Sequence, residues 1–301
     1  MHVTLIHNPN AGDGKRLDRK ALLAAIRAAG HRAVYCSSHD PDLADVLRRP
    51  TDLVAIAGGD GTVAKVAKRM HGRGVLLAVL PTGTANNIAS SLGLSGVPLE
   101  EQPARWAAGR RAKLDIGSAY GPWGSTRFVE AFGLGLLPFG IRRAIASQGA
   151  PHSSAEEKVT KAVTTMRKAL CGCEPALIGA MLDGRDISGH YLLLQAMNIN
   201  FVGPSLNLAP AANPGDGLLD VVLVSEDERD LLDAYLAAAE AGDACPPALP
   251  LRRGRGLQVE WTGFAVHIDD NLWRSPGRKR VRTTAIEISL PGESVEFLLP
   301  R

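Results

Sequence analysis

The sequence has few aromatic residues, few cysteines and little net charge. Aromatic residues make up only 5% of the 301 residues, and 34 Lys and Arg against 31 Asp and Glu leave a net charge of +3. So small an excess does not indicate a protein that binds nucleic acid. The cysteines lack the pairing of a zinc site, and we expect reduced thiols, as in the cytoplasm. They are Cys36, Cys171, Cys173 and Cys245.

Long apolar runs are missing as well. No segment approaches the roughly 18 apolar residues of a membrane span, and the start, MHVTLIHNPN, has no basic segment followed by an apolar one. We therefore expect a cytoplasmic protein with no transmembrane segment. Any membrane contact is expected to be peripheral, at the inner face of the membrane.

The composition that remains is that of a folded protein, with 45% hydrophobic and 22% charged residues, and its length predicts two domains. In the first third, short β-branched segments alternate with helical patterns. This alternation predicts an α/β domain with an open, doubly wound parallel sheet over residues 1–112. The predicted strands are 2–7, 32–36, 52–57 and 75–80, and the predicted helices are 16–29, 41–48 and 63–71.

Strands separated by turn residues dominate after residue 112. We predict a β-rich, sandwich-like domain over residues 113–301, whose last residues are expected to pack back on the first domain. Two helices, 155–170 and 226–241, interrupt the strands. The predicted strands are 113–119, 126–132, 176–182, 191–196, 219–224, 257–261, 265–268, 285–290 and 295–298.

The segment 57–63, AGGDGTV, sets a carboxylate among glycines after a predicted buried strand. The glycines let backbone N–H groups approach phosphate oxygens, and a helix expected from Val63 directs its N-terminal N–H groups at them. Asp60 would repel a phosphate unless Mg²⁺ joins the two, so the pattern favours a magnesium nucleotide. A plain Asp-Gly turn is the alternative.

Two further loops follow predicted strands. The loop 7–15 is not a Walker A motif, because Pro9 and Arg16 stand where that motif needs Gly and Ser or Thr. The loop 80–89, LPTGTANNIA, offers side-chain oxygens from Thr82, Thr84 and Asn86, as helix caps or as ligand contacts. Loops after adjacent strands lie at one sheet edge, which favours a shared nucleotide cleft.

GGDGT followed by LPTGTANN closely resembles the diacylglycerol kinase-like lipid kinases, which include bacterial lipid kinases and sphingosine kinases. The NPNAG loop, Asn198, the segment 210–221 (PAANPGDGLLDV) and the segment 268–271 match further landmarks of that family in order. GGDGT alone also occurs in phosphofructokinases and NAD kinases. The other segments favour the lipid kinases.

The resemblance implies an ATP site between an α/β domain and a β-sandwich domain that admits a lipid hydroxyl. It implies nucleotide contacts from Asn8, Ser37, Gly58, Gly59, Asp60, Gly61, Thr62, Thr82, Gly83, Thr84 and Asn86. It places Asp60 and Asp115 in a network of Mg²⁺ and water. It also implies a structural metal held by Asp216 and by the backbone carbonyls of Asn213 and Leu218, although this loop is equally compatible with a plain turn.

The chain departs from the family at three positions. The usual Asp-Gly-Glu, which holds the candidate general base, reads Asp269-Asp270-Asn271, and an amide cannot take up a proton near neutral pH. The predicted catalytic residues are therefore Asp269 and Asp60, with Asp269 acting alone or assisted by Asp270. Asn87 stands where Asp is common. Lys65 stands where Glu is common, and we expect it on a solvated helix face, with a contact to phosphates as the alternative.

Two other features bear on a lipid surface. The apolar segment 131–141, followed by Arg142 and Arg143, is interpreted as buried core, with a lipid-facing surface as the alternative. Two basic groups are interpreted as solvated loops, with an anionic membrane patch as the alternative. They are Arg252, Arg253 and Arg255, and Arg274, Arg278, Lys279, Arg280 and Arg282.

The leading hypothesis is an ATP- and Mg²⁺-dependent kinase that phosphorylates a hydroxyl of a lipid, such as diacylglycerol, at a membrane surface. A member that binds nucleotide or lipid without transfer is the second hypothesis, motivated by Asn271, Asn87 and Lys65. A soluble kinase of the NAD kinase type is the third. A homodimer is compatible with exposed sheet edges.

Overall fold

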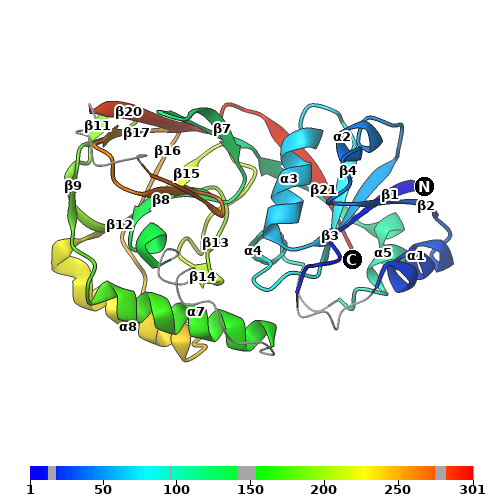
Figure 1. Ribbon diagram of the computed structural model, residues 1–301, viewed down its shortest axis with the longest axis horizontal. Helices are drawn as coiled ribbons and strands as arrows, with labels where there is room; N and C mark the ends of the chain where they lie inside the picture. Colours follow the sequence, from blue (N-terminus) through cyan, green and yellow to red (C-terminus); the bar gives the residue numbers. More distant parts are fainter. Residues whose placement is uncertain (13–17, 95–96, 141–153, 275–282, 301) are drawn as a thin grey trace. The chain divides into compact units, whose positions relative to one another are not determined.

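The computed structural model describes residues 1–12, 18–94, 97–140, 154–274 and 283–300. The chain divides into two compact units, Met1–Ile116 with Gly292–Arg301, and Gly117–Pro291. Figure 1 shows helices packed around a sheet in the first unit and mainly strands, with two long helices, in the second. The boundary expected after residue 112 lies inside a strand of the first unit, Arg110–Asp115.

The first unit is an α/β domain with a mostly parallel sheet, in the order β2-β1-β3-β4-β21-β5. β1 to β4 and β21 run parallel, and β5 is antiparallel to β21. The strands are β1 His2–His7, β2 Arg32–Ser37, β3 Leu53–Gly58, β4 Leu76–Pro81, β5 Arg110–Asp115 and β21 Ser294–Leu299. The helices are α1 Arg19–Ala28, α2 Leu43–Val46, α3 Asp60–Met70, α4 Asn87–Ser91 and α5 Gln102–Arg105, with a 3₁₀ turn at Trp106–Ala108.

Local sequence accounts for these elements. β3 is buried along its whole length, as expected for a parallel strand covered on both faces, which explains its uninterrupted apolar sequence LVAIAG. α1 begins after Asp18, whose Oδ1 accepts the N–H of Ala21 at 2.8 Å, and it buries Leu22, Leu23 and Ile26. The predicted start of this helix, at residues 16 and 17, lies outside the described residues.

The second unit is a β-sandwich. Its two antiparallel sheets have the orders β11-β10-β17-β20-β6-β7 and β16-β15-β12-β8-β18-β19, and β9 also pairs with β12. Apolar side chains from both sheets form one core that includes Phe128, Phe132, Leu194, Val259 and Ile286.

The strands of the second unit are short. They are β6 Gly117–Gly121, β7 Gly124–Phe128, β8 Ala131–Gly135, β9 Ala176–Ile178, β10 Ala180–Leu182, β11 Arg185–Asp186, β12 Gly189–Met197, β13 Phe201–Val202, β14 Leu206–Asn207, β15 Leu219–Ser225, β16 Leu251–Gly254, β17 Gly256–Trp261, β18 Val266–Ile268, β19 Asn271–Trp273 and β20 Thr284–Ser289. β13 and β14 form a separate hairpin.

The strand predicted at 113–119 is wrong, because two strands occupy it. β5 ends at Asp115 in the first unit, and β6 begins at Gly117 in the second. Between them, Ile116 donates its N–H to the carbonyl of Glu293 at 2.8 Å. A Cβ at Gly117 would lie 2.2 Å from the ring of Phe128, so a side chain there would force this buried ring to move. Apolar patterning does not reveal the change of sheet, since Leu114 and Asp115 at the end of β5 and Gly117 at the start of β6 are all buried.

The apolar segment 131–141 is buried core where it is described. Phe132 and Leu134 of β8 pack in the sandwich, and Leu136 and Leu137 pack with the helices on the other side of that sheet. The preferred interpretation of this segment is therefore confirmed. Arg142 and Arg143 lie outside the described residues.

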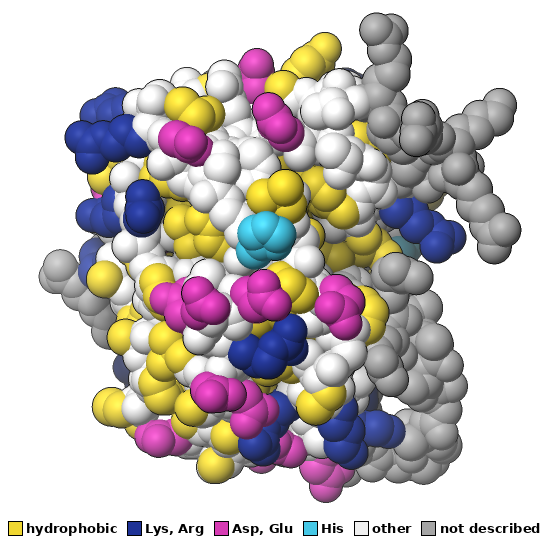
Figure 2. Space-filling model, turned by 90° about the vertical axis from the view of Figure 1, so that its left-hand side faces the viewer, with side chains coloured by type: hydrophobic (Ala, Val, Ile, Leu, Met, Phe, Trp, Pro, Cys, Tyr) yellow, Lys and Arg dark blue, Asp and Glu magenta, His cyan; other side chains and the backbone are white. Residues whose placement is uncertain are grey.

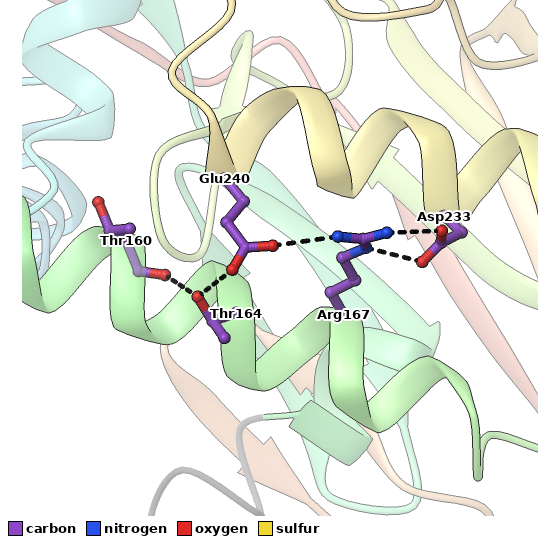
Figure 3. Close-up of polar contacts among 5 residues, drawn as sticks. All are labelled: Thr160, Thr164, Arg167, Asp233 and Glu240. Carbon is purple, nitrogen blue, oxygen red and sulfur yellow. Dashed lines mark hydrogen bonds and ion pairs between the residues drawn. The ribbon is translucent and has the colours of Figure 1, made fainter.

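Two helices, α7 Ala155–Leu170 and α8 Arg229–Glu240, lie side by side along one side of the second unit (Figure 1). A capping box of Ser154 and Glu157 starts α7, and a 3₁₀ turn at Glu226–Glu228 precedes α8. Arg167 of α7 forms ion pairs with two residues of α8, Asp233 at 2.9 Å and Glu240 at 3.3 Å (Figure 3). These ion pairs link the two helices through their polar side chains.

On the face drawn in Figure 2, the described residues do not form a surface that stands out as membrane-binding. On the coloured part of the face in Figure 2, acidic and basic side chains are intermixed with apolar ones. Of the two basic groups, Arg252 and Arg253 belong to β16, whereas most of the later group lies outside the described residues. No helix in the described ranges is long and apolar enough to span a bilayer. The four cysteines are free thiols.

Candidate functional site

The helix α3 begins at Asp60, not near Val63 as predicted. Gly59 is its N-cap, and its carbonyl accepts the N–H groups of Thr62 at 2.9 Å and Val63 at 3.1 Å. Glycine is tolerated at a cap, and the motif residues Asp60, Gly61 and Thr62 thus form the first helical turn rather than a loop. N–H groups of a first turn lack partners within the helix, which makes this end suited to an anion.

The GGDGT and LPTGTANN segments touch through their glycines. A Cβ added to Gly83 would lie 2.3 Å from the Cα of Gly59, and one added to Gly58 would lie 2.6 Å from the Cβ of Thr62. Neither contact leaves space for a side chain. Close backbone packing between the two segments therefore requires glycine at position 83, whereas Gly58 makes room for the side chain of Thr62 within the GGDGT segment.

A pocket of about 370 Å³ opens beside these segments in the first unit. Of the predicted nucleotide contacts, it brings together Asn8, Gly59, Asp60, Gly61, Thr62, Gly83 and Thr84. Ser38 and His39, which the sequence interpretation did not assign to nucleotide binding, also line it, as does Lys65, for which a phosphate contact was the alternative interpretation. The loops after β1, β2, β3 and β4 thus share one pocket, as expected for the carboxyl ends of parallel strands.

Asn8 connects three of the pocket loops. Its Nδ2 donates to Thr62 Oγ1 at 3.1 Å, and its Oδ1 accepts the N–H of Asn10 at 3.0 Å. The same oxygen lies 3.1 Å from Nε2 of His39. Asn8 therefore shapes the pocket by tying the β1 loop to α3 and to the loop after β2.

Four other predicted contacts do not line the described pocket. Gly58 packs on Thr62, and Ser37 Oγ accepts the N–H of His39 at 3.2 Å, so that the next residue, Ser38, faces the pocket instead. Thr82 is buried, with 3% of its surface exposed. Asn86 has a left-handed backbone, with φ of 55°, and its Oδ1 accepts the N–H of Gly83 at 2.9 Å. Asn86 thus supports the loop that carries Gly83 and Thr84.

Asp60 joins the two motif helices. Its Oδ1 accepts the N–H of Ile88 in the first turn of α4 at 2.9 Å. Burial raises the pKa of the Asp60 carboxyl, and backbone N–H groups from Ile88 and neighbouring residues oppose that shift. Asp60 therefore lines the pocket while part of its hydrogen-bonding capacity is used to hold α4 against α3.

Lys65 is not on a solvated helix face. Its side chain is half-buried and lines the pocket, and Nζ donates to the carbonyl of Ser38 at 2.6 Å. Helical spacing offered a clue to this position, because Lys65 lies on the same side of the helix as Thr62. The preferred interpretation of Lys65 was therefore wrong.

The carboxylates expected around Mg²⁺ do not form an evident metal cluster. Asp115 is buried and its Oδ1 forms an ion pair with Nζ of Lys113 at 2.7 Å. Within the described ranges, no group of three or more His, Cys, Asp or Glu side chains is arranged to hold a metal ion. The pocket residues therefore fit a magnesium ion carried mainly by phosphates, with Asp60 as the pocket carboxylate, rather than an ion held by protein alone.

Asp269 belongs to the second unit and is buried, with 7% of its surface exposed. Its Oδ1 accepts the N–H of Glu130 at 2.8 Å and that of Val129 at 3.0 Å, and its Oδ2 lies 3.2 Å from the latter. The adjacent Asp270 and Asn271 are exposed. Asp269 therefore supports the turn between β7 and β8, whichever chemical role it has.

The same turn contains a carboxylate that the sequence interpretation missed. Glu130 is 2% exposed, and its carbonyl accepts the N–H of Asn198 at 2.9 Å. Asn198 also donates from Nδ2 to the carbonyl of Val129 at 2.7 Å. Two landmarks of the predicted family thus hold the same turn: Asn198, directly after β12, and Asp269, in the β18–β19 connection.

The loop with the implied structural metal is already neutralised by an arginine. Arg253 of β16 forms ion pairs with Asp216 Oδ2 at 2.5 Å and with the buried Asp220 at 3.0 Å. Asp216 Oδ1 accepts the N–H of Leu218 at 3.0 Å, and the carbonyl of Asn213 accepts the N–H of Asp216 at 3.3 Å. The Asp216 carboxylate is thus engaged by Arg253 and by the Leu218 N–H, and the implied structural metal stays a prediction.

The chain matches two family models, which together cover most of it. Residues 2–119 match the diacylglycerol kinase catalytic domain, and residues 140–289 match the YegS C-terminal NAD kinase beta sandwich-like domain. It is similar to "Diacylglycerol kinase" of Mycobacterium tuberculosis (26% identity, covering 90% of this chain and 88% of the relative). It is also similar to "Probable lipid kinase YegS-like" of Pseudomonas aeruginosa (28%, covering 97% and 95%).

A solved structure shares the fold. A diacylglycerol kinase from Bacillus anthracis str. Sterne superposes with a TM-score of 0.67 at 19% sequence identity, covering 99% of this chain and 96% of that one. The likeness extends over both units. At this level of identity it supports the α/β plus β-sandwich architecture and nothing finer.

Proposed function

Because the chain belongs to the diacylglycerol kinase-like family of lipid kinases, we propose that it transfers the γ-phosphoryl group of ATP to a hydroxyl group of a lipid such as diacylglycerol. The main support for an ATP site is the pocket at the first turn of α3. The loop that contains Gly83 packs directly against Gly59, the N-cap of this helix. Its volume of about 370 Å³ suits a small-molecule site.

The chemistry proposed for the pocket is mainly positioning. N–H groups of the first turn, at Asp60 and Gly61, bind phosphate oxygens, while Asn8 and Thr62 keep the neighbouring loop in place. When bound, Mg²⁺ supplies charge neutralisation on the β- and γ-phosphates, and Asp60 is the lining residue that would hold it.

For the proton of the lipid hydroxyl, Asp269 remains the proposed acceptor. Its carboxylate accepts the N–H groups of Val129 and Glu130, which fix its position, and a carboxylate is a side chain able to take up a proton from a hydroxyl. Phosphoryl transfer through a loose transition state makes a modest demand on a base. Asn271 cannot take this role, because an amide does not accept a proton near neutral pH.

The test is transfer of γ-labelled phosphate from ATP and Mg²⁺ to mixed micelles of a total lipid extract. We expect label in the organic phase, and chromatography of the product identifies the acceptor. Asp269→Asn is expected to lose transfer and retain ATP binding, whereas Asp270→Asn, a change at an exposed neighbour, is expected to retain both.

Two outcomes would contradict this function. If the unaltered protein binds ATP but labels no lipid, the protein is a binding member without transfer, which the engaged carboxylate of Asp269 would then explain. If label enters NAD in water and no lipid, it is a soluble kinase of the NAD kinase type.

A further inference from the structure

Lys65 is placed differently from Arg69 of the same helix. On α3, Ala64, Val66 and Ala67 are buried against the unit, and Lys65 follows Thr62 by one helical turn on the pocket side. Arg69, one turn further, is exposed and donates to the carbonyl of Lys65 at 2.9 Å. The side chain of Lys65 therefore reaches the pocket from the side of α3 that faces it.

The contacts of this ammonium leave donors available. Nζ has three N–H groups, and one of them meets the Ser38 carbonyl at 2.6 Å. No ion pair joins Lys65 to a carboxylate within the described residues, so its charge is not cancelled by a bound acid there. A half-buried cation with unused donors is suited to a mobile anionic ligand.

The other charged group of the pocket, Asp60, is negative, so a cation in the lining would favour binding of an anionic ligand. Asp60 contributes a carboxylate to the lining, and the described residues supply no cluster of acids that would hold Mg²⁺ independently of a ligand. An ATP molecule brings several negative charges into this pocket. A nearby positive charge lowers the electrostatic cost of placing them beside Asp60.

We propose that Lys65 binds the polyphosphate of the nucleotide, supplying positive charge from the second turn of α3 while the first turn supplies neutral N–H groups. The inference rests on the proposed ATP site and adds a phosphate-binding residue to it. In the absence of nucleotide the ammonium rests on the Ser38 carbonyl, and the flexible four-carbon side chain allows it to turn to a phosphate oxygen.

A purely structural role makes a different prediction. If Lys65 only ties α3 to the loop after β2, a neutral donor at this position should suffice. Lys65→Gln retains an N–H donor and removes the charge, whereas Lys65→Arg retains the charge. Arg69→Met is the matched control, because it removes an exposed cation from the same helix without changing the pocket lining.

The experiment is calorimetric titration of the full-length protein and these variants with ATP, ADP, AMP and adenosine, with Mg²⁺ and with EDTA. For Lys65→Gln and Lys65→Met we expect a loss of about tenfold to a hundredfold in ATP affinity. The loss should decrease from ATP to AMP and be absent for adenosine. Lys65→Arg should restore ATP affinity, and Arg69→Met should not change it. The salt dependence of ATP affinity should weaken in the neutral variants.

Melting temperatures of the ligand-free variants verify that they are folded. Equal losses for ATP and adenosine, or full affinity in Lys65→Gln, would overturn the inference and leave Lys65 as a tether. If the unaltered protein binds ATP and Lys65→Met binds it equally well, the inference fails and the ATP site stands. If the unaltered protein binds none of the four compounds, the proposed function fails and the inference falls with it.

Discussion

The two units use their motif carboxylates in different surroundings. In the first, Asp60 accepts the N–H of Ile88 and still lines an open pocket. In the second, the buried Asp269 accepts the N–H groups of Val129 and Glu130, and Asp216 of another loop forms an ion pair with Arg253. The first unit thus combines support and ligand access in one side chain, whereas the second directs its carboxylates mainly to its own backbone and to an arginine.

This difference shows that a motif residue can stabilise the fold in addition to any role in ligand binding or catalysis. A carboxylate is the strongest acceptor available for exposed backbone N–H groups, and loops at strand ends have many such groups. Asp60 and Asp269 both meet this need. Substitutions in one unit at a time test whether the structural contacts of these segments can be altered without loss of ligand binding or catalysis.

The largest effect is expected from Gly83→Ala. The added Cβ would lie 2.3 Å from the Cα of Gly59, a backbone atom that cannot rotate away. We expect a loss of about 1–3 kcal/mol in the free energy of unfolding, as in overpacked sites, and loss of ATP binding because the pocket loops separate. Urea unfolding and calorimetry measure the two effects. Gly172→Ala, where a Cβ meets nothing within 4 Å, is the control. Normal ATP affinity in Gly83→Ala would show that the loop contact does not shape the site.

A smaller effect is expected from Arg253→Met in the second unit. This change leaves the buried Asp220 and the partly exposed Asp216 without their cation. Breaking a fully buried pair costs several kcal/mol, but Arg253 is 43% exposed, so we expect about 1–2 kcal/mol. Because the arginine already neutralises the loop, EDTA should not change the melting temperature of the unaltered protein, and metal analysis should find no bound ion. A stoichiometric metal, or a lower melting temperature in EDTA, would contradict this. Arg252→Met, at the adjacent residue, is the control.

The smallest effect is expected from Asp60→Asn, and it depends on pH. Burial raises the pKa of Asp60 in the folded protein above its ordinary value of 3.8, so the protonated form favours folding. Its contribution to stability is complete below the unfolded pKa and is lost as the pH rises through the folded one. Asn keeps an acceptor for the N–H of Ile88 and has no charge. The stability of Asp60→Asn relative to the unaltered protein should therefore increase as the pH rises from about 4 towards neutrality. Urea unfolding at several pH values measures this, and a difference independent of pH would contradict it.

Much of the fold could be predicted because local chemistry repeats along the chain. The strand 2–7 and the helix 155–170 have the predicted bounds, since the first is a β-branched apolar run and the second begins at a capping box of Ser154 and Glu157. Helix α3 was predicted to begin too late, because Asp and Gly are typical of turns, and tertiary contacts of Asp60 with α4 support them in a helix.

The sequence by itself determined the α/β and β-sandwich domains, the family and the glycine-rich segments of the pocket. These depend on periodicity and on residues adjacent in the chain. Only the tertiary structure decided the partners of the polar side chains. Lys65 meets the Ser38 carbonyl, Asp269 meets Val129 and Glu130, and Arg253 neutralises Asp216 and Asp220. Such contacts join segments far apart in the sequence, and a charged side chain takes whichever partner the fold brings within reach, because burying it unpaired would cost too much free energy.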